Sequence, residues 1–467
     1  MMKPSTKITS IIITCALLLV GCNNENNKTA KEVSNINKEF LNDLKHRTFN
    51  FFWDIMDGNT WQIPDRYPTE SFTSVAATGF GLTSYLVGIK NNYISREEGA
   101  KRVLETLKWL KNSKQGPDAS EVTGYKGFYY HFLTYNQGVR YKNVELSTID
   151  TAWLIAGILA CQTFFDENNE QEQQIRELAD FLYKRVDWNW AMDGHEVMTM
   201  GWHPESGFIN AKYIGYSEAM MLVILGLASP THPIPDSTWS AWCNTYIWKN
   251  FHGYKYINFE PLFGHQYSHM YIDFRGIQDN FMKDKGIDYF ENSRRATLAN
   301  RNYCIENPQN FNAYSDSIWG LSACDGPADT VMLINDNKVQ FFSYRARGAS
   351  VRYIDDDGTI APTAAGGSIP FAPEECINAL VAMKNTYGKK VYGKYGFKDA
   401  FNPTFISPKT PSGWFDSDYL GIDQGPILIQ LENYQSGFIW DLMKKNKYII
   451  TGLKKAGFKG GWLDSSE

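Results

Sequence analysis

Three acidic residues stand at or near the beginnings of apolar, helix-like stretches, where a carboxyl group could take part in catalysis. Glu218 is the one carboxylate in the stretch Gly215–Leu225, which is otherwise mainly apolar. Burial there would raise its pKa, as a general acid requires at neutral pH. Asp150 and Asp423 precede apolar runs as well. For these two residues a helix cap is as good an explanation as catalysis.

Carboxylates beside an aromatic-rich cleft are what glycoside hydrolysis needs, because one protonated acid serves the leaving oxygen and one ionised base activates water. Aromatic residues make up 15% of the 467 residues, and they suit both sugar stacking and core packing. The formal net charge of −5 gives no reason to expect nucleic acid as a partner. The composition also excludes a disordered chain, a disulfide scaffold and a coiled coil.

His265 and His269 have the i, i+4 spacing of some zinc ligands. No glutamate follows the first histidine and no third ligand is in view, so we expect no metal and no cofactor; sugar binding or helix packing explains the pair better. The turn Asp355–Gly358 fails the calcium-loop pattern and reads as a hairpin turn. No serine-hydrolase, phosphate-loop or dinucleotide motif appears in the right context.

The elements that would position these residues are mostly helices. Apolar periodicity predicts helices over 35–57, 71–90, 95–113, 146–164, 169–190, 214–228, 237–250, 268–283, 287–307, 315–323, 372–387, 425–443 and 446–456. One β-like patch covers Val339–Ile354. Start signals include probable capping boxes at Ser95 and Ser147.

Loop lengths alternate along the chain, with long segments before 146, 214, 268 and 425 and short joints after the helices that follow. Helices that follow long loops are apolar, and those that follow tight turns are amphipathic. Six inner helices starting at 71, 146, 214, 268, 315 and 425, with six outer ones, form an all-α (α/α)6 toroid. The inner helix N-termini would share one mouth, which favours anions and carries free N–H groups.

The N-terminus predicts export. Residues 1–21 carry two lysines and a short apolar run that ends in Leu19–Cys22, which looks like a bacterial lipoprotein signal. We expect Cys22 to be acylated and to anchor the protein in the bacterial envelope, with 22–34 as a polar tether and 35–467 as a single domain; an ordinary secretory signal is the alternative. The other mature cysteines read as buried thiols, and the protein is expected to be a monomer.

Several motifs carry a specific family resemblance over about residues 40–456. They are Glu145–Ala152, Gly215–Met220, Ser229–Pro233, Phe263–His269, Tyr314–Leu321 and Leu420–Pro426. The chain resembles the glycoamylase-like lipoproteins of Bacteroidota, a group similar to glycoside hydrolase family 144 with its β-1,2-glucanases and sophorose-releasing enzymes. The resemblance implies an (α/α)6 fold and inverting hydrolysis of a glucan. It matches Glu218 to the acid candidate and Asp150 and Asp423 to other essential carboxylates, and leaves the identity of the base open.

Further residues in loops and at helix starts are candidates for substrate binding: Trp202, His265, Tyr267, His269, Arg275, Asp316, Trp319, Glu374, Trp414 and Gln424. For Glu374, a place in the first turn of an outer helix is the stronger explanation. A polysaccharide lyase is an alternative that would use Tyr267, a histidine and Arg275. A non-catalytic glycan-binding lipoprotein is another, and would use the loop tryptophans Trp61, Trp202 and Trp414. The sequence alone does not separate β-1,2 from α-1,4 linkages.

Overall fold

The computed structural model describes residues 37–334 and 337–465. The chain divides into two units, Met1–Leu44 and Lys45–Glu467. Residues 37–44 of the first unit are helical, as are residues 45–54 of the second. The signal peptide, the tether and Cys22 lie outside the described residues. Within the described part of the chain, no helix combines the length and the apolar composition needed to span a bilayer.

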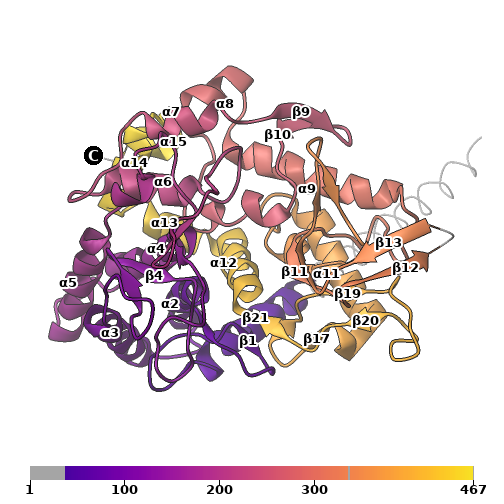
Figure 1. Cartoon of the computed structure of the whole chain (residues 1–467), viewed down its shortest axis with the longest axis horizontal. Coiled ribbons are helices and arrows are strands. Elements are labelled where there is room, and N and C mark those ends of the chain that lie inside the picture. The colour runs from indigo at the N-terminus through magenta and orange to yellow at the C-terminus, as the bar shows by residue number, and fades with distance from the viewer. Residues whose placement is uncertain (1–36, 335–336, 466–467) are drawn as a thin grey trace, which may run out of the picture. The chain divides into compact units, whose positions relative to one another are not determined.

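The larger unit is mostly helical, and its most deeply buried helices pack against one another in series. These are α2 (Val75–Lys90), α4 (Thr148–Phe164), α6 (Met220–Ala228) and α12 (Gly421–Ser436). Helix α4 packs on α2 and α6, and α12 packs on α2. Figure 1 shows α2, α4 and α12 inside the unit, with α3 and α5 at its edge.

A second layer consists of helices with a charged face. They are α3 (Arg96–Asn112), α5 (Glu170–Arg185), α9 (Tyr289–Glu306), α11 (Pro373–Tyr387) and α14 (Lys447–Lys455). Of these, α3 packs on α2, α5 packs on α4, and α14 packs on α6. Apolar helices inside and amphipathic helices outside are the two layers that the sequence predicts.

Shorter helical segments complete the unit. They are η1 (Trp190–Met192), α7 (Thr238–Cys243), η2 (Leu262–His265), η3 (Ser268–Met270), α8 (Asn280–Lys285), α10 (Pro362–Gly366), η4 (Gly388–Lys390), α13 (Phe438–Met443) and α15 (Gly461–Asp464). Segment η3 and helix α10 both pack against α12. Segment η3 lies within the predicted helix 268–283, whereas α10 lies in a segment where the sequence predicts no helix.

The strands are short and antiparallel. One five-stranded sheet has the order β3 (Gly124–Tyr125), β4 (Phe128–Tyr130), β6 (Leu146–Ser147), β7 (Gly201–His203) and β8 (Gly207–Phe208). The other strands form pairs. Three pairs join segments far apart in the sequence or lie before α9: β1 (Arg66–Tyr67) with β21 (Tyr419–Leu420), β2 (Thr73–Ser74) with β5 (Phe132–Leu133), and β9 (Trp248–Phe251) with β10 (Tyr254–Ile257). Five pairs lie after α9: β11 (Ala323–Asp325) with β14 (Tyr344–Ala346), β12 (Thr330–Ile334) with β13 (Asn337–Phe341), β15 (Gly348–Ala349) with β16 (Ile354–Asp355), β17 (Tyr392–Gly393) with β18 (Gly396–Phe397), and β19 (Phe401–Asn402) with β20 (Trp414–Phe415).

Local sequence signals explain the helix starts. Ser95 caps α3 and forms the complete capping box with Glu98, as predicted. Ser147 caps α4 by accepting the N–H of Asp150. Helices α2 and α4 approach closely at two glycines: a Cβ on Gly157 would lie 2.1 Å from the carbonyl oxygen of Gly79. Only glycine permits this approach of the two backbones.

Three predicted helices are wrong in extent or absent. The helix predicted over 268–283 consists of η3 and α8 with a non-helical segment between them, and 237–250 is helical only over α7. Residues 315–323 form no α-helix: the Ser315 hydroxyl accepts the N–H of Ile318 at 3.0 Å, and Gly320 has a φ of 142°. The Ser315 N–H also donates to the carbonyl of Ile318 at 3.0 Å, in the direction opposite to a helical hydrogen bond, and the positive φ of Gly320 is not helical.

Candidate active site

Glu218 lies immediately before α6, and a side chain from η3 fixes its backbone. The Ser268 hydroxyl donates to the carbonyl of Glu218 at 2.9 Å and accepts the N–H of Met221 at 3.1 Å. Ser268 thus supplies the N-terminal cap that the helix's own residue Ala219 cannot provide. The predicted helix over 214–228 starts only at Met220, because Gly215 has a left-handed φ of 82°.

The side chain of Glu218 is half-buried and lines a cavity of about 270 Å³. Its other lining residues are Met200, Tyr213, Ile214, Ser217, Phe259, Glu260, Phe263, Arg352 and Tyr353. Burial, against an opposing backbone hydrogen bond and with a smaller contribution from the charge of Asp150, raises the pKa of Glu218 to about 7. A carboxyl group with this pKa retains a transferable proton near neutrality.

Asp150 lies in the first turn of α4 and is buried. The Ser147 hydroxyl donates to its Oδ2, and the Nε2 of His131 lies 3.6 Å from its Oδ1. His131 also contacts Oε1 of Glu145 through Nδ1 at 2.8 Å. Burial alone would lower the pKa of His131, but these two carboxylates outweigh it and raise the pKa to about 9. A cationic imidazole therefore joins Asp150 to Glu145 at neutral pH.

Asp423 lies in the first turn of α12 and is also buried. The alternative explanation of Asp423 as a helix cap does not hold, because the helix begins before it, at Gly421. No N–H or O–H donor of the described chain reaches its Oδ2. Burial raises the pKa of Asp423 to about 7; a hydrogen bond with Asp399 opposes the rise, and neighbouring aspartates add to it.

Tyr267 is a buried residue whose pKa is affected by all three carboxylates. It is buried between η2 and η3, and its hydroxyl donates to the carbonyl of Ile422 at 3.0 Å. Burial raises the pKa of Tyr267 well above its usual value, and the charges of Asp423, Glu218 and Asp150 all contribute to the rise. Electrostatic effects of this size act over short distances. Glu218, Asp150 and Asp423 therefore all act electrostatically on one tyrosine.

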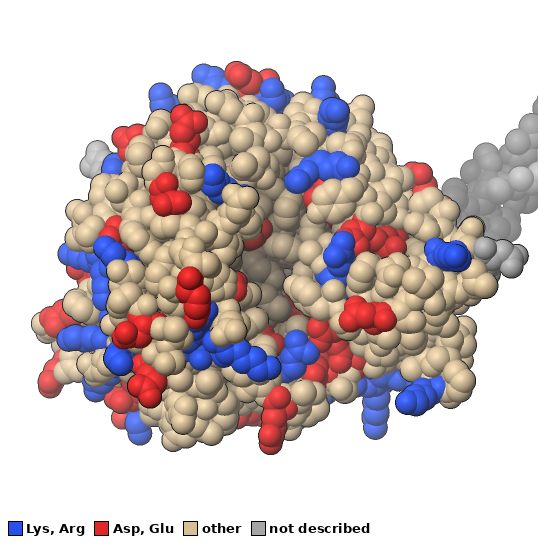
Figure 2. Space-filling view, in the orientation of Figure 1, with Lys and Arg blue, Asp and Glu red and all other residues tan. Residues whose placement is uncertain are grey.

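A dense group of aspartates adjoins Asp423. Arg66 contacts Oδ2 of Asp325 at 2.5 Å and Oδ2 of Asp65 at 3.1 Å, and lies 3.8 Å from Asp418. Carboxylate oxygens of Asp325, Asp399 and Asp416 lie within 4.8 Å of one another, which is the one spacing among the described residues that would suit a metal ion. Arg66 already supplies positive charge to this group. Figure 2 shows acidic atoms on the walls of a hollow, in the part of the view where Figure 1 places α12.

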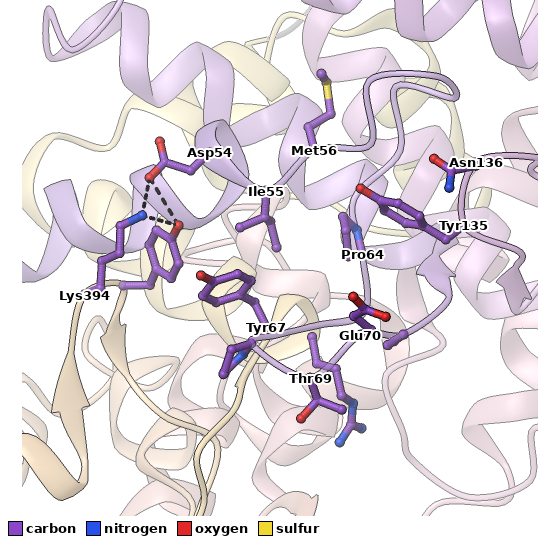
Figure 3. A pocket seen from close by; sticks show the side chains of 14 residues that line it. Asp54, Ile55, Met56, Pro64, Tyr67, Thr69, Glu70, Tyr135, Asn136 and Lys394 are labelled. Carbon is purple, nitrogen blue, oxygen red and sulfur yellow. Dashed lines mark hydrogen bonds and ion pairs between the residues drawn. The ribbon is translucent and has the colours of Figure 1, made fainter.

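A second cavity, of about 800 Å³, is lined by Arg66 and by none of Glu218, Asp150 and Asp423. Figure 3 shows Asp54 and Lys394 on one side of it, Tyr135 and Asn136 on the other, and Tyr67 and Glu70 between them. Lys394 pairs with Asp54 at 3.1 Å. Tyr67 and Tyr135 expose 40% and 45% of their surface, so their rings are available to a ligand. Exposed aromatic rings with polar groups beside them suit a sugar.

Most of the predicted substrate-binding residues lie elsewhere. His265, His269, Trp319 and Gln424 are fully buried. The ring of His265 stacks on Tyr216, His269 contacts Ser293, and Gln424 donates to the carbonyl of Phe397. Burial lowers the pKa of both histidines to about 3. The prediction that these four residues contact substrate is therefore corrected, because none exposes surface to a ligand.

Three charged candidates lie on the surface. Arg275 pairs with Asp273 at 2.7 Å and covers the ring of Trp440 at 4.3 Å. Asp316 lies in an exposed turn, and Glu374 lies exposed in the first turn of α11. None has a recorded interaction with Glu218, Asp150 or Asp423. The lyase alternative loses its support, since its histidines are buried and Arg275 is neutralised elsewhere.

The two loop tryptophans are half-buried. Trp202 in β7 packs against Tyr125 and Trp190, with ring centroids 5.2 and 5.7 Å apart. Trp414 in β20 packs beside Cys324, Ala361 and Ala400. Each presents one face to the protein and keeps part of its ring exposed, which leaves a binding role for both as a prediction.

Sequence reasoning missed His131, Asp65, Arg66 and Asp399. His131 lies in the long segment before α4, and that segment's length was the available signal. Asp399 and its neighbours come from loops between short strands, where no periodicity marks a residue as close to α12.

The chain is similar to known proteins in sequence and in fold. Residues 210–447 match the Glycoamylase family model, whose description is "Putative glucoamylase". The endo-β-1,2-glucanase of Chitinophaga pinensis, solved with sophorotriose and glucose, is 30% identical with a TM-score of 0.79, over 91% of this chain and 99% of that one. A crystal structure described as a "putative glucoamylase" from Bacteroides uniformis is 31% identical with a TM-score of 0.78, over 92% and 99%.

A curated relative, the exo β-1,2-glucooligosaccharide sophorohydrolase (non-reducing end) of Parabacteroides distasonis, is 26% identical over 456 residues. The match covers 90% of this chain but only 58% of that relative. The family model matches residues 210–447, and the similarity to these solved structures extends over nearly the whole chain. The chain therefore belongs to the Glycoamylase family.

Proposed function

We propose that the protein is an inverting glycoside hydrolase that cleaves β-1,2-linked glucan or gluco-oligosaccharides. Glu218 acts as the general acid and Asp423 as the general base. The observation that carries this assignment is the place of Glu218 on the wall of the 270 Å³ cavity, where burial raises its pKa to about 7. A proton donor and an ionisable base near one cavity are what an inverting reaction requires.

Asp423 is favoured over Asp150 as the base for a geometric reason. Both oxygens of Asp150 have partners, Ser147 and His131. Asp423 has one oxygen, Oδ2, that no donor of the described chain reaches. A general base needs such a free oxygen to accept a proton from water. Burial raises the pKa of Asp150 and the charge of His131 opposes the rise; the charge of Asp150 in turn raises the pKa of Glu218.

The substrate class is inferred from the relatives, whose names specify β-1,2-glucan and its oligosaccharides. The 270 Å³ cavity at Glu218 and the 800 Å³ cavity beyond Arg66 are proposed to bind glucosyl units on opposite sides of the carboxylates. The helical layers are proposed to form the (α/α)6 toroid, with η2–η3 and α10 in two of the inner positions. The protein is proposed to be an exported monomer anchored through Cys22.

The test is hydrolysis of a panel of purified glucans by the native protein, Glu218→Gln and Glu196→Gln, a matched change at an exposed residue. The native protein and Glu196→Gln are expected to release reducing ends from β-1,2-glucan. Glu218→Gln is expected to lose at least ~10²-fold in turnover, in line with general-acid contributions. Proton NMR of the first products should show the inverted anomer. Hydrolysis of α-1,4-glucan alone would refute the linkage, and equal rates for all three proteins would refute the role of Glu218.

A further inference from the structure

Glu260 lines the same cavity of about 270 Å³ as Glu218, and the proposed mechanism gives it no part. The residue exposes only 2% of its surface. Its Oε1 accepts a hydrogen bond from the Ser350 hydroxyl at 2.6 Å, whereas its Oε2 has no hydrogen-bond partner among the described residues. A buried carboxylate oxygen without a donor is costly, and such atoms are uncommon in native proteins. The free oxygen of Glu260 therefore indicates a donor that comes from a molecule bound in the cavity.

The turn Ser350–Tyr353, which joins β15 to β16, is held against Glu260. Beside the Ser350 hydroxyl, the Val351 N–H donates to Oδ1 of Asn258 at 3.2 Å. Strand β15 lies so close to Glu260 that a Cβ on Gly348 would be 2.2 Å from the carbonyl carbon of Glu260, so only glycine fits there. The turn therefore has a fixed position beside the free carboxylate oxygen.

Two side chains of this turn, Arg352 and Tyr353, line the cavity as well. The Nε of Arg352 lies 3.5 Å from Oε1 of Glu260, and its Nη1 lies 3.4 Å from the point where a Cβ on Gly215 would stand. Arg352 thus spans from Glu260 to the segment that leads into Glu218. The side chain of Arg352 is 31% exposed and Tyr353 is 50% exposed, so both can contact a ligand.

The chemistry of these three side chains favours a neutral ligand that is rich in hydroxyl groups. A carboxylate only accepts hydrogen bonds and a guanidinium only donates them, whereas a hydroxyl group does both. The opposite charges of Glu260 and Arg352 offset each other, so the pair attracts neither an anion nor a cation strongly. The half-exposed ring of Tyr353 supplies an apolar face for the C–H groups of a sugar. Aromatic rings with a few fixed polar groups are typical of a small-molecule site.

We propose that Glu260, Arg352 and Tyr353 form a subsite for one glucosyl unit of the glucan. In this subsite Oε2 of Glu260 accepts a hydrogen bond from a sugar hydroxyl, Arg352 donates to a sugar oxygen, and the ring of Tyr353 packs on the sugar face. None of the three is among the residues that the sequence predicts for substrate binding. This inference rests on the proposed function, since it takes a glucan as the ligand of the Glu218 cavity.

The first experiment measures the affinity for sophorotriose and for maltotriose by calorimetry in a Glu218→Gln background, which limits hydrolysis. Glu260→Gln keeps the size of the side chain and removes its charge, so affinity is expected to fall roughly tenfold. Tyr353→Ala is expected to weaken binding by roughly 3–10-fold through the loss of one aromatic contact. Glu196→Gln and Tyr434→Ala, at exposed residues, are the matched controls and should leave affinity unchanged. Unchanged affinity in both Glu260→Gln and Tyr353→Ala would overturn the proposal.

The second experiment tests the hydrogen bond itself, with forms of the trisaccharide that each lack one hydroxyl group. One of these forms should bind roughly tenfold more weakly than the parent sugar to the protein that retains Glu260. The same form should show little loss on Glu260→Gln, because the two changes remove the same bond. A merely structural role of Glu260 would leave the effect of each missing hydroxyl the same in both proteins, and that result would overturn the proposal.

These measurements separate failure of the subsite from failure of the proposed function. Binding of maltotriose but not of sophorotriose would refute the proposed linkage, and the subsite is then tested with maltotriose in the same way. Binding of neither sugar would overturn both proposals. Circular dichroism checks the fold of each variant. If Glu260→Gln does not fold, Arg352→Ala and Tyr353→Ala, which alter exposed side chains, take its place, and unchanged affinity in both would overturn the subsite.

Discussion

The imidazole Nε2 of His131 lies 3.6 Å from Oδ1 of Asp150, and its Nδ1 lies 2.8 Å from Glu145. These contacts raise the pKa of His131 to about 9, against an ordinary value of about 6.5. The imidazolium thus stabilises the fold most below pH 6.5, and this contribution is lost as the pH rises through 9.

We therefore expect His131→Asn to destabilise the protein by about 1–2 kcal/mol at pH 6, with allowance for partial exposure of the ring. The difference should vanish by about pH 10. Urea unfolding at both pH values measures it, and His195→Asn, at an exposed histidine, is the control. A difference that does not change with pH would contradict the pairing.

The raised pKa of Glu218 predicts an alkaline limit to activity. Because the acid must be protonated, kcat/KM on glucan should decline tenfold per pH unit above about 7. An activated aryl glycoside, if it is a substrate, should show a weaker decline, since its leaving group needs little protonation. An alkaline limb that appears only above pH 9 would exclude Glu218 as the acid.

Ring stacking in the large cavity can be tested by binding. In a Glu218→Gln background, Tyr135→Ala should weaken the affinity for long β-1,2-gluco-oligosaccharides by roughly 3–10-fold, as expected for one aromatic contact. Calorimetry with short and long oligosaccharides measures this effect, which should disappear for the shortest. Tyr434→Ala removes a similarly exposed tyrosine, 41% against 45%, and should leave affinity unchanged. Equal affinities for both variants would place the glucan elsewhere.

The contact between α2 and α4 predicts a stability effect. Gly157→Ala would place a Cβ 2.1 Å from a backbone oxygen of Gly79, so the helices must separate. We expect a loss of about 2–3 kcal/mol in the free energy of unfolding. Gly58→Ala meets nothing within 4 Å and is the matched control. A neutral Gly157→Ala would show that the helices have room to move.

Export and acylation can be tested together. Cys22→Ser should shift the protein from the membrane fraction to the soluble fraction of its bacterial host, because a diacylated terminus is what would retain it. Mass analysis of the mature N-terminus should find lipid on Cys22. Cleavage at another residue would favour an ordinary secretory signal.

Local signals predicted the parts of the fold that depend on neighbouring residues. Ser95 and Glu98 marked the start of α3, and the apolar run after Glu218 marked α6 and the unusual environment of its carboxylate. The helix predicted over 315–323 is absent because the Ser315 N–H bonds forward to the Ile318 carbonyl and Gly320 adopts a positive φ, which apolar periodicity does not reveal.

Contacts between distant segments could not be predicted in the same way. His131 meets Asp150 through a loop, and Arg66 meets Asp325 although 259 positions separate them in the sequence. Neither pair has a fixed spacing or period in the sequence. The two buried histidines show the opposite error. The i, i+4 spacing of His265 and His269 suggested a role in substrate binding, but both side chains are packed in the protein interior.

Helix α12 packs on α2, although α2 is synthesised near the start of the unit and α12 near its end. Helix α2 therefore cannot complete this contact until α12 has been synthesised. At about 5–20 residues per second, the 331 residues from Lys90 to Gly421 take roughly 20–70 seconds to synthesise. During that time an apolar side of α2 lacks its final neighbour. A chain that stops before Gly421 loses the closing helix and Asp423 at once, so C-terminal truncation cannot separate catalysis from folding, and point substitutions are needed for that purpose.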